Sequence, residues 1–273
     1  MTGQERDDDD DAGRPPGIDT SVAHQARIYD YWLGGKDNFA VDREAGDRAV
    51  AAYPGMAKAV RANRAFLARA VRYLAAEAGV RQFLDIGTGI PAGNNTHEVA
   101  QSVAPESRIV YVDNDPVVLL HARALLTSAP EGACAYLDAD LRDTGKILAE
   151  AAAPLDFGAP VALMLLGILQ VIPDSDDPFG VVAELLRALA PGSYLVISHV
   201  ASDLDNRAVQ AAALLDAMSV ESRTLRSHAE VARFFDGTEL VAPGIVPVAH
   251  WRPESELQAA APTSRWGGVG RKA

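Results

Sequence analysis

The sequence is poor in the residues that build disulfides and metal sites. It has one cysteine, Cys134, among 273 residues, and its six histidines are scattered without ligand spacing. A single cysteine excludes an intrachain disulfide, and we expect no bound metal. Cys134 lies in an apolar stretch, which is typical of a buried structural thiol.

Long apolar runs are also missing. The N-terminus has no apolar core of the kind that a signal peptide needs, and no later run is long enough to span a bilayer. We therefore expect a cytoplasmic protein.

Basic charge is scarce as well. Against 37 acidic residues stand 25 lysines and arginines, which gives a formal net charge of -12. Such a surface repels phosphate backbones and anionic lipid headgroups, so neither nucleic acid nor a membrane is an expected partner. A small-molecule partner fits better. The sequence has no heptad run, so it does not indicate an oligomeric state.

The rest of the composition is that of a globular protein, with 48% apolar and 23% charged residues. Residues 1–17 differ, because five consecutive aspartates and several glycines and prolines cannot bury enough apolar surface to order the chain. We expect a disordered acidic tail over 1–17, a helical extension over 18–79 and an enzymatic core over 80–273.

Helical patterns fill the extension. Apolar residues recur at helical spacing over 21–33, 42–52 and 56–78. Thr20 or Ser21 is suited to cap the first helix, and Gly34 and Gly35 are suited to end it.

Strands and helices alternate after the extension. Short apolar runs predict strands at 82–86, 108–112, 133–137, 161–166 and 194–198, and helices are expected at 96–103, 116–126, 144–152 and 178–189. Helices are also expected at 206–217 and 227–235, followed by β-like runs at 240–250 and 264–269. This alternation predicts a doubly wound, mostly parallel α/β sheet, with a hairpin closing it.

The first strand runs into a glycine-rich loop that contains Asp85, Gly87, Thr88 and Gly89. Ligands of doubly wound folds bind at this end of the sheet, where glycines let the backbone approach a cofactor. A dinucleotide site requires G-x-G-x-x-G, but here the third glycine, Gly93, comes one position late. Asp85 would repel a diphosphate, whereas it can hold the cationic part of S-adenosylmethionine.

Aspartates also end the second and third strands. Asp113 lies at the distance past the glycines where an acidic side chain can bind ribose hydroxyls. Asp115 precedes Pro116 and is better explained as a helix cap. Asp140, after the third strand, is a candidate to accept the adenine amino group.

Together these motifs resemble the class I S-adenosylmethionine-dependent methyltransferases, and more closely an actinobacterial subfamily of them. The similarity covers nearly all of the chain from residue 18 onward, and it rests on the segments RIYDYWLGGKDNF (27–39), NRAFL (63–67), FLDIGTG (83–89), YVDNDP (111–116), ADLRD (139–143), GILQVIPD (167–174) and GGVGRK (267–272).

The resemblance implies a Rossmann-like, seven-stranded sheet with its last strand antiparallel. It also implies a cofactor pocket that includes backbone from 166–169, with Gly167, and is lined by Gly87, Thr88, Gly89, Asp113, Asn114, Asp140 and Leu141.

The loop 90–95 is longer than is usual in the family. Asn95 and Glu98 have the spacing of a capping pair, so His97 would lie in a first helical turn and needs no ligand to explain it.

The extension offers further donors for a cofactor carboxylate, namely Arg27, Asn63 and Arg64, beneath a loop at Gly34 that could close over the ligand. Alternatively, both arginines pair with acidic neighbours such as Asp30 or Asp42.

Methyl transfer from a sulfonium is an in-line displacement that depends mainly on orientation. If a base is needed, His199 and Gln170 are the candidates, although His199 is equally explained by a backbone partner at a strand end. Tyr29, Tyr31 and Trp32 could wall an apolar acceptor site or pack in a core.

Two other functions stay open at this point. One is a regulator that binds S-adenosylmethionine without transferring its methyl group, because the sequence has no obvious base. The other is an NAD(P)-dependent oxidoreductase, which the late third glycine and Asp85 disfavour.

Overall fold

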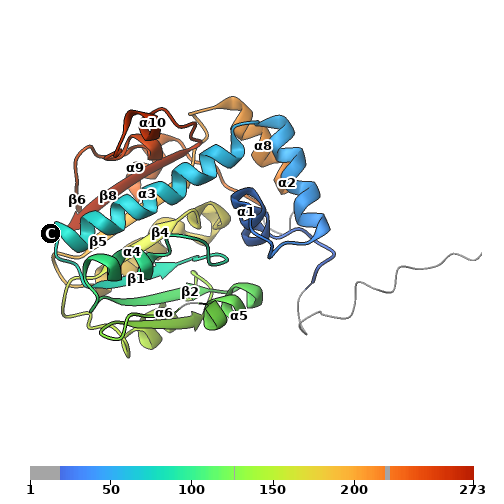
Figure 1. The fold of residues 1–273 in the computed structure, drawn as a ribbon. Coiled ribbons are helices and arrows are strands. Elements are labelled where there is room, and N and C mark those ends of the chain that lie inside the picture. The colour runs from blue at the N-terminus through green and yellow to red at the C-terminus, as the bar shows by residue number, and fades with distance from the viewer. Residues whose placement is uncertain (1–18, 126, 219–221) are drawn as a thin grey trace, which may run out of the picture.

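The computed structural model describes residues 19–125, 127–218 and 222–273, so the predicted tail at 1–17 lies outside the described residues. Figure 1 shows helices on both faces of a central sheet. Beside the ends of its strands lies a group of helices from the N-terminal part of the chain. In the described part, no helix has both the length and the hydropathy to cross a membrane.

The sheet is mostly parallel, as predicted. Its strand order is β3-β2-β1-β4-β5-β8-β6, and the short β7 pairs with β8. The first five strands run parallel, whereas β8 is antiparallel to β5. The strands are β1 (Gln82–Ile86), β2 (Arg108–Asp113), β3 (Ala133–Asp138), β4 (Ala162–Leu166), β5 (Tyr194–Val200), β6 (Thr238–Leu240), β7 (Val246–Pro247) and β8 (Arg265–Lys272).

Helices connect the first five strands, and their ends lie within about one residue of the predicted ones. These helices are α4 (Thr96–Val103), α5 (Pro116–Leu125), α6 (Thr144–Ala151) and α7 (Pro178–Ala188). Two 3-10 turns, η2 (Leu169–Val171) and η3 (Asp174–Asp176), separate β4 from α7. The strand order reverses between β2 and β4, on either side of β1, which opens a crevice at the carboxyl ends of these strands.

The end of the chain differs from the prediction. The β-like run at 240–250 is wrong as a single strand, because Pro243 and Gly244 form a turn and Gly244 has a φ of 86°. Pro247 then leads into the 3-10 turn η4 (Val248–His250). A short helix, α10 (Glu256–Ala259), was not predicted, and β8 extends to Lys272.

The extension forms α1 (Gln25–Leu33), α2 (Ala40–Ala52) and α3 (Met56–Ala76). The expected start of α1 is wrong by several residues, because its N-cap is His24 and neither Thr20 nor Ser21. The predicted stop is confirmed, since Gly34 caps the helix with a left-handed φ of 88°.

Apolar cores hold these layers together. One face of the sheet packs on α6, α7 and α9 (His228–Arg233), and the opposite face packs on α3 and α4 through side chains such as Phe66 and Trp251. A third core joins α1, α2 and α3 to α8 (Asn206–Asp216), a helix that follows β5. The extension is thereby fixed beside the strand ends.

Cys134 lies in β3 and is partly buried. Burial raises the pKa of its thiol to about 11, although a hydrogen bond with Ser128 opposes the shift. The thiol is therefore protonated at neutral pH, as expected of a structural cysteine.

Candidate functional site

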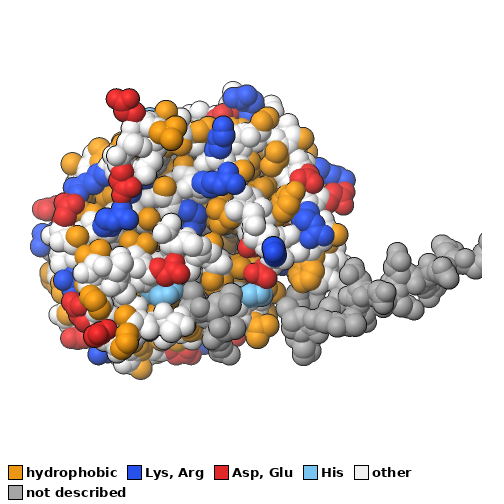
Figure 2. Space-filling view, in the orientation of Figure 1, with side chains coloured by type: hydrophobic (Ala, Val, Ile, Leu, Met, Phe, Trp, Pro, Cys, Tyr) orange, Lys and Arg blue, Asp and Glu red, His pale blue; other side chains and the backbone are white. Residues whose placement is uncertain are grey.

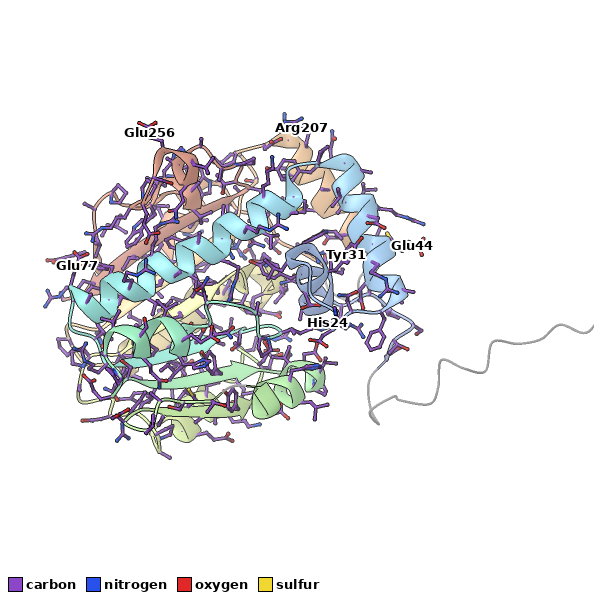
Figure 3. All side chains as sticks on the ribbon, viewed as in Figure 1. His24, Tyr31, Glu44, Glu77, Arg207 and Glu256 are labelled. Atoms are coloured by element: carbon purple, nitrogen blue, oxygen red, sulfur yellow. The ribbon has the colours of Figure 1, made fainter. Side chains whose placement is uncertain are left out.

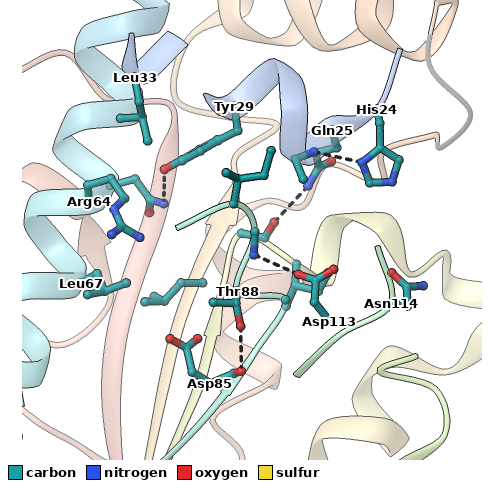
Figure 4. A pocket seen from close by; sticks show the side chains of 18 residues that line it. His24, Gln25, Tyr29, Leu33, Arg64, Leu67, Asp85, Thr88, Asp113 and Asn114 are labelled. Carbon is teal, nitrogen blue, oxygen red and sulfur yellow. Dashed lines mark hydrogen bonds between the residues drawn. The ribbon is translucent and has the colours of Figure 1, made fainter. Parts of the chain in front are cut away.

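A cavity lies at the carboxyl ends of β1, β2 and β4, beneath α1 and α3 (Figure 4). Elements of the core and of the extension therefore share one site. It is lined by His24, Gln25, Ala26, Tyr29, Leu33, Asn63, Arg64, Leu67, Asp85, Gly87, Thr88, Gly89, Ile90, Asp113, Asn114, Leu166, Gly167 and Ile168.

Asp85, near the end of β1, supplies a carboxylate at the base of this cavity. It is only 4% exposed, and Thr96 donates a hydrogen bond of 2.6 Å to its Oδ2. Burial raises the pKa of Asp85 to about 6, while the Thr96 bond and the charge of Arg64 oppose the shift. At neutral pH the carboxylate is mostly ionised and can attract a cationic group.

The loop after β1 requires glycine at two positions. Gly87 and Gly89 have φ values of 73° and 67°, which side chains rarely adopt. A Cβ on Gly87 would lie 2.5 Å from Ile168, whereas a Cβ on Gly89 would enter open space. The backbone at Gly89 is thus open to a ligand.

Asp113 ends β2 and holds this loop in place. Its carboxylate accepts the backbone N–H of Gly89 at 2.9 Å and that of Asp115 at 3.0 Å. Burial raises its pKa, and these two bonds oppose the rise. A carboxylate can accept further bonds from ligand hydroxyls. Asp115 caps α5 as predicted, because its Oδ1 accepts the N–H of Val117.

A second cavity adjoins the first and shares Gly87, Asp113, Asn114 and Ile168 with it. Asp140 and Leu141, both predicted site residues, line this second cavity. Asn114 donates to Asp140 at 3.2 Å. The hydrogen bond from Arg142 lowers the pKa of Asp140, which favours the charged acceptor.

Polar side chains of the extension face the first cavity. Asn63 donates to the Tyr29 hydroxyl at 3.0 Å, and Arg64 donates to the carbonyl of Gly93 at 3.0 Å. Three buried atoms here, Gln25 Oε1, Asn63 Oδ1 and Arg64 Nε, have no hydrogen-bond partner among the described residues. Buried polar atoms without partners fit a site that takes a polar, zwitterionic ligand.

The structure does not place Arg27 in the cavity. Its guanidinium donates to the carbonyls of Asp19 and Val22, and its Nε lies 3.4 Å from Asp42. Arg27 is 4% exposed and Asp42 is fully buried. The alternative of an ion pair with an acidic neighbour therefore describes Arg27, because packing of α1 on α2 directs it away from the cavity.

The two candidate bases also lie outside the described lining of both cavities. His199 is fully buried, with Nδ1 on the carbonyl of Val200 and Nε2 accepting from Arg226 at 2.8 Å. Burial lowers the pKa of His199 to about 3. Gln170 donates to the carbonyl of Gly167. Both side chains are engaged inside the protein, which corrects their expected position at the acceptor.

Of the aromatic residues considered for the acceptor wall, Tyr29 lines the cavity. Tyr31 bonds to Asp47 instead, and Trp32 bonds to the carbonyl of Gly46. His97 bonds to the Tyr111 hydroxyl through its backbone and its ring, so it needs no ligand.

His24 and Gln25 are lining residues that the sequence did not indicate. Gln25 donates to the carbonyl of Gly167, 142 residues away along the chain. His24 reaches Asp115 of the core, and Figure 3 shows it on the inner side of α1, whereas Glu44 and Arg207 point outward. Neither residue belongs to a motif, so only the packing of α1 reveals them.

Comparisons with known proteins agree with this geometry. Residues 11–273 match the model of a family described as S-adenosyl methyltransferase. The chain is 47% identical to a DUF574 family protein from Streptomyces avermitilis, with a TM-score of 0.90 and coverage of 93% of this chain and 99% of that one. It is 42% identical to a candidate methyltransferase from Thermobifida fusca, with a TM-score of 0.87 and coverage of 94% and 98%. No curated protein matches the chain.

The fold extends to a more distant structure. An S-adenosylmethionine-dependent methyltransferase from Anabaena variabilis is similar with a TM-score of 0.50 at 13% identity, over 73% of this chain and 80% of that one. The family match spans nearly the whole sequence, and the cavity has the carboxylates and glycines that the cofactor needs. The chain belongs to the S-adenosyl methyltransferase family and is an enzyme whose cofactor is S-adenosylmethionine.

Proposed function

We propose that this enzyme methylates a small molecule by in-line transfer within the cavity beneath α1. The observation that carries the proposal is the position of Asp85, Gly89 and Asp113 around one cavity that α1 and α3 cover. The cavity is set into the protein, and the net charge of -12 disfavours a nucleic-acid acceptor.

Each lining group has a role that follows from its chemistry. Bound S-adenosylmethionine supplies an electrophilic methyl group on a sulfonium. The ionised Asp85 attracts the cationic end of the cofactor, and Arg64 and Asn63 offer donors to its carboxylate. Asp113 accepts from the ribose hydroxyls, while Asn114, Asp140 and Leu141 line the adjoining space for the base.

Orientation is the main contribution of the protein to the rate. Holding donor and acceptor in line can supply about 7 to 11 kcal/mol. Tyr29 and Leu33 of α1 line the cavity and would limit the access of water to a bound ligand. Among the described lining residues His24 is the one imidazole, and it is paired with Asp115.

Calorimetric titration with S-adenosylmethionine and with S-adenosylhomocysteine tests the site. We expect micromolar binding, weakened at least tenfold, or about 1.4 kcal/mol, by Asp113→Ala. Asp138→Ala is the matched control, because this aspartate ends β3 but is exposed and lies outside the lining. Equal binding by wild type and Asp113→Ala would contradict the assignment.

Transfer is tested separately with methyl-labelled S-adenosylmethionine and a small-molecule fraction of cell extract. Label should enter a low-mass product with wild type and not with Asp113→Ala. Binding without any transfer would instead support a regulatory protein that keeps the cofactor site.

A further inference from the structure

Arg265 is the first residue of β8 and lies against Gly167, which lines the cavity. A Cβ on Gly167 would lie 3.1 Å from Nη1 of Arg265, so the guanidinium packs against the Cα of this glycine. Gly167 lines the cavity. Tyr29, another lining residue, is close enough to Arg265 to affect the pKa of its guanidinium. The guanidinium is therefore adjacent to the end of the cavity formed by β4 and α1.

This guanidinium has no counter-ion in the described part of the chain. Its Nη1 is buried without a hydrogen-bond partner, and no described carboxylate lies within ion-pair distance of it. The neighbouring Arg223 and Arg226 differ, because they pair with Asp216 and Asp174. Burial lowers the pKa of Arg265. Arg265 as a whole is half-buried, but a buried guanidinium nitrogen without a partner is costly unless a ligand satisfies it.

Other buried polar atoms without partners surround Gly167. Gln25 and Gln170 both donate to its carbonyl, and Oε1 of each glutamine has no partner among the described residues. The carbonyl of Ser198 accepts the N–H of Gly167. The hydroxyl of Ser198 is buried and also has no hydrogen-bond partner among the described residues. Around Gly167, a guanidinium nitrogen, a hydroxyl and the amide oxygen of the lining residue Gln25 thus lack partners among the described residues.

We propose that the methyl acceptor is a small carboxylic acid and that Arg265 binds its carboxylate. The inference rests on the proposed function and names the class of its acceptor. The planar guanidinium matches a carboxylate with two parallel hydrogen bonds, and Ser198 can donate a further one. A hydroxyl or amine hydrogen of the same molecule suits the oxygen of Gln25, which lines the cavity. Because the surface as a whole repels anions, recognition of an acid requires a local cation of this kind.

The test compares acids with their neutral amides on protein saturated with S-adenosylhomocysteine. Two matched pairs serve as probes, namely 4-hydroxybenzoate with 4-hydroxybenzamide and propionate with propionamide. Ligand-observed NMR titration of wild type should show at least one acid binding tenfold or more tightly than its amide. Arg265→Gln should remove this preference, and Arg265→Lys should keep part of it, because lysine retains the charge but loses the fork.

Arg271→Gln is the matched control, since Arg271 lies on the same strand and is exposed. It should leave the acid preference within about twofold of wild type. Thermal melting supplies a second readout. Removal of a guanidinium that has no ion-pair partner among the described residues should not lower the melting temperature, and 4-hydroxybenzoate should raise it for wild type but not for Arg265→Gln.

Three results would overturn the inference: acids that bind no better than amides, a preference that survives Arg265→Gln, or a large drop in melting temperature that marks Arg265 as structural. Binding of S-adenosylhomocysteine is measured in the same samples. Its loss in wild type would contradict the proposed function, whereas its presence without an acid preference would contradict only the role of Arg265.

Discussion

His24 Nδ1 lies 2.9 Å from Oδ2 of Asp115, so the residue that precedes α1 is bonded to the residue that precedes α5. A second pair of the same kind, His121 with Asp37 at 3.1 Å, joins α5 to the loop after α1. These two contacts hold the extension against the core on either side of α1. They add to the apolar core that joins α1, α2 and α3 to α8.

We expect His24→Ala to lower the free energy of unfolding by about 1 kcal/mol at pH 7, because it removes the hydrogen bond that His24 Nδ1 donates to Asp115. Burial raises the pKa of Asp115, but the bond to His24 outweighs this effect and the net pKa is lowered. A lowered carboxylate pKa stabilises the fold above the unfolded pKa, and this stabilisation is lost as the pH falls through the folded pKa. The deficit of the variant should thus shrink toward acid pH.

Urea unfolding at pH 7 and at about pH 3, below the ordinary aspartate pKa of 3.8, measures this dependence. His250→Ala is the control, because His250 is exposed and lies outside the described lining of the cavity. His24→Ala should also bind S-adenosylhomocysteine more weakly than wild type. Unchanged stability and binding would show that the pair does not hold the extension in place.

Asp85→Asn should stabilise the fold while it weakens cofactor binding. The pKa of Asp85 is raised from 3.8 to about 6, mainly by burial, so its ionisation destabilises the folded state as the pH rises through this interval. The shift corresponds to about 3 kcal/mol. Asparagine can still accept the Thr96 hydrogen bond.

We therefore expect the variant to exceed wild type by up to about 3 kcal/mol at pH 7.5 and to match it near pH 4. Denaturant titrations at both pH values give the difference, and the exposed Asp138→Asn is the control. A stability gain that is independent of pH would show that Asp85 does not titrate in this range.

A comparison of Gly87→Ala with Gly89→Ala separates the effect of backbone strain on stability from the effect of a blocked backbone on cofactor binding. Both substitutions put a Cβ at a positive φ, which costs about 1 to 3 kcal/mol. Only at Gly87 does the Cβ also collide with Ile168, so this variant should be the less stable of the two. At Gly89 the methyl group points into open space, so the main loss there should be in affinity for S-adenosylhomocysteine. Melting temperatures and calorimetry distinguish the two effects.

Arg226→Leu should cost about 3 kcal/mol, because it leaves buried groups without partners. Arg226 donates to the carbonyls of Leu169 and Ile172 and to His199. Its acidic partner, Asp174, is 68% exposed, so Asp174→Asn should change stability by under about 1 kcal/mol. Urea unfolding compares both variants with wild type, and similar losses in the two would refute this division.

Local sequence predicted the core of the site because the relevant groups end strands. A parallel strand fixes where its last residue lies, so Asp85, Asp113 and Asp140 could be placed at the cavity from the strand pattern and the glycine loop alone. The capping pair of Asn95 and Glu98 is also confirmed at the start of α4, since it depends only on residues within one turn.

Predictions failed where the packing of two elements decided the direction of a side chain. Arg27 lies on α1, but the packing of α2 decides that it meets Asp42 and not the cavity. His199 ends β5, and the alternation of side chains along that strand points it to the face that carries Phe234. The neighbours that these side chains contact depend on how other elements pack against α1 and β5.

Figure 2 illustrates the same limit on the surface, where acidic and basic side chains are interspersed on one face although the composition is strongly acidic. Net charge is a property of the sequence, but the field at a given point depends on which charges the fold brings there or buries. Arg265 is such a case, since no motif marks it.

By itself the sequence determined the alternation of strands and helices, the glycine loop and the acidic residues that end β1 and β2, because periodicity and backbone sterics act over a few residues. The tertiary structure alone decided that α1 covers the cavity, that His24 meets Asp115, and that Arg265, which has no counter-ion among the described residues, lies against Gly167. His24 and Asp115, like Gly167 and Arg265, lie more than 90 positions apart in the sequence, and only the packing of the layers brings them into contact.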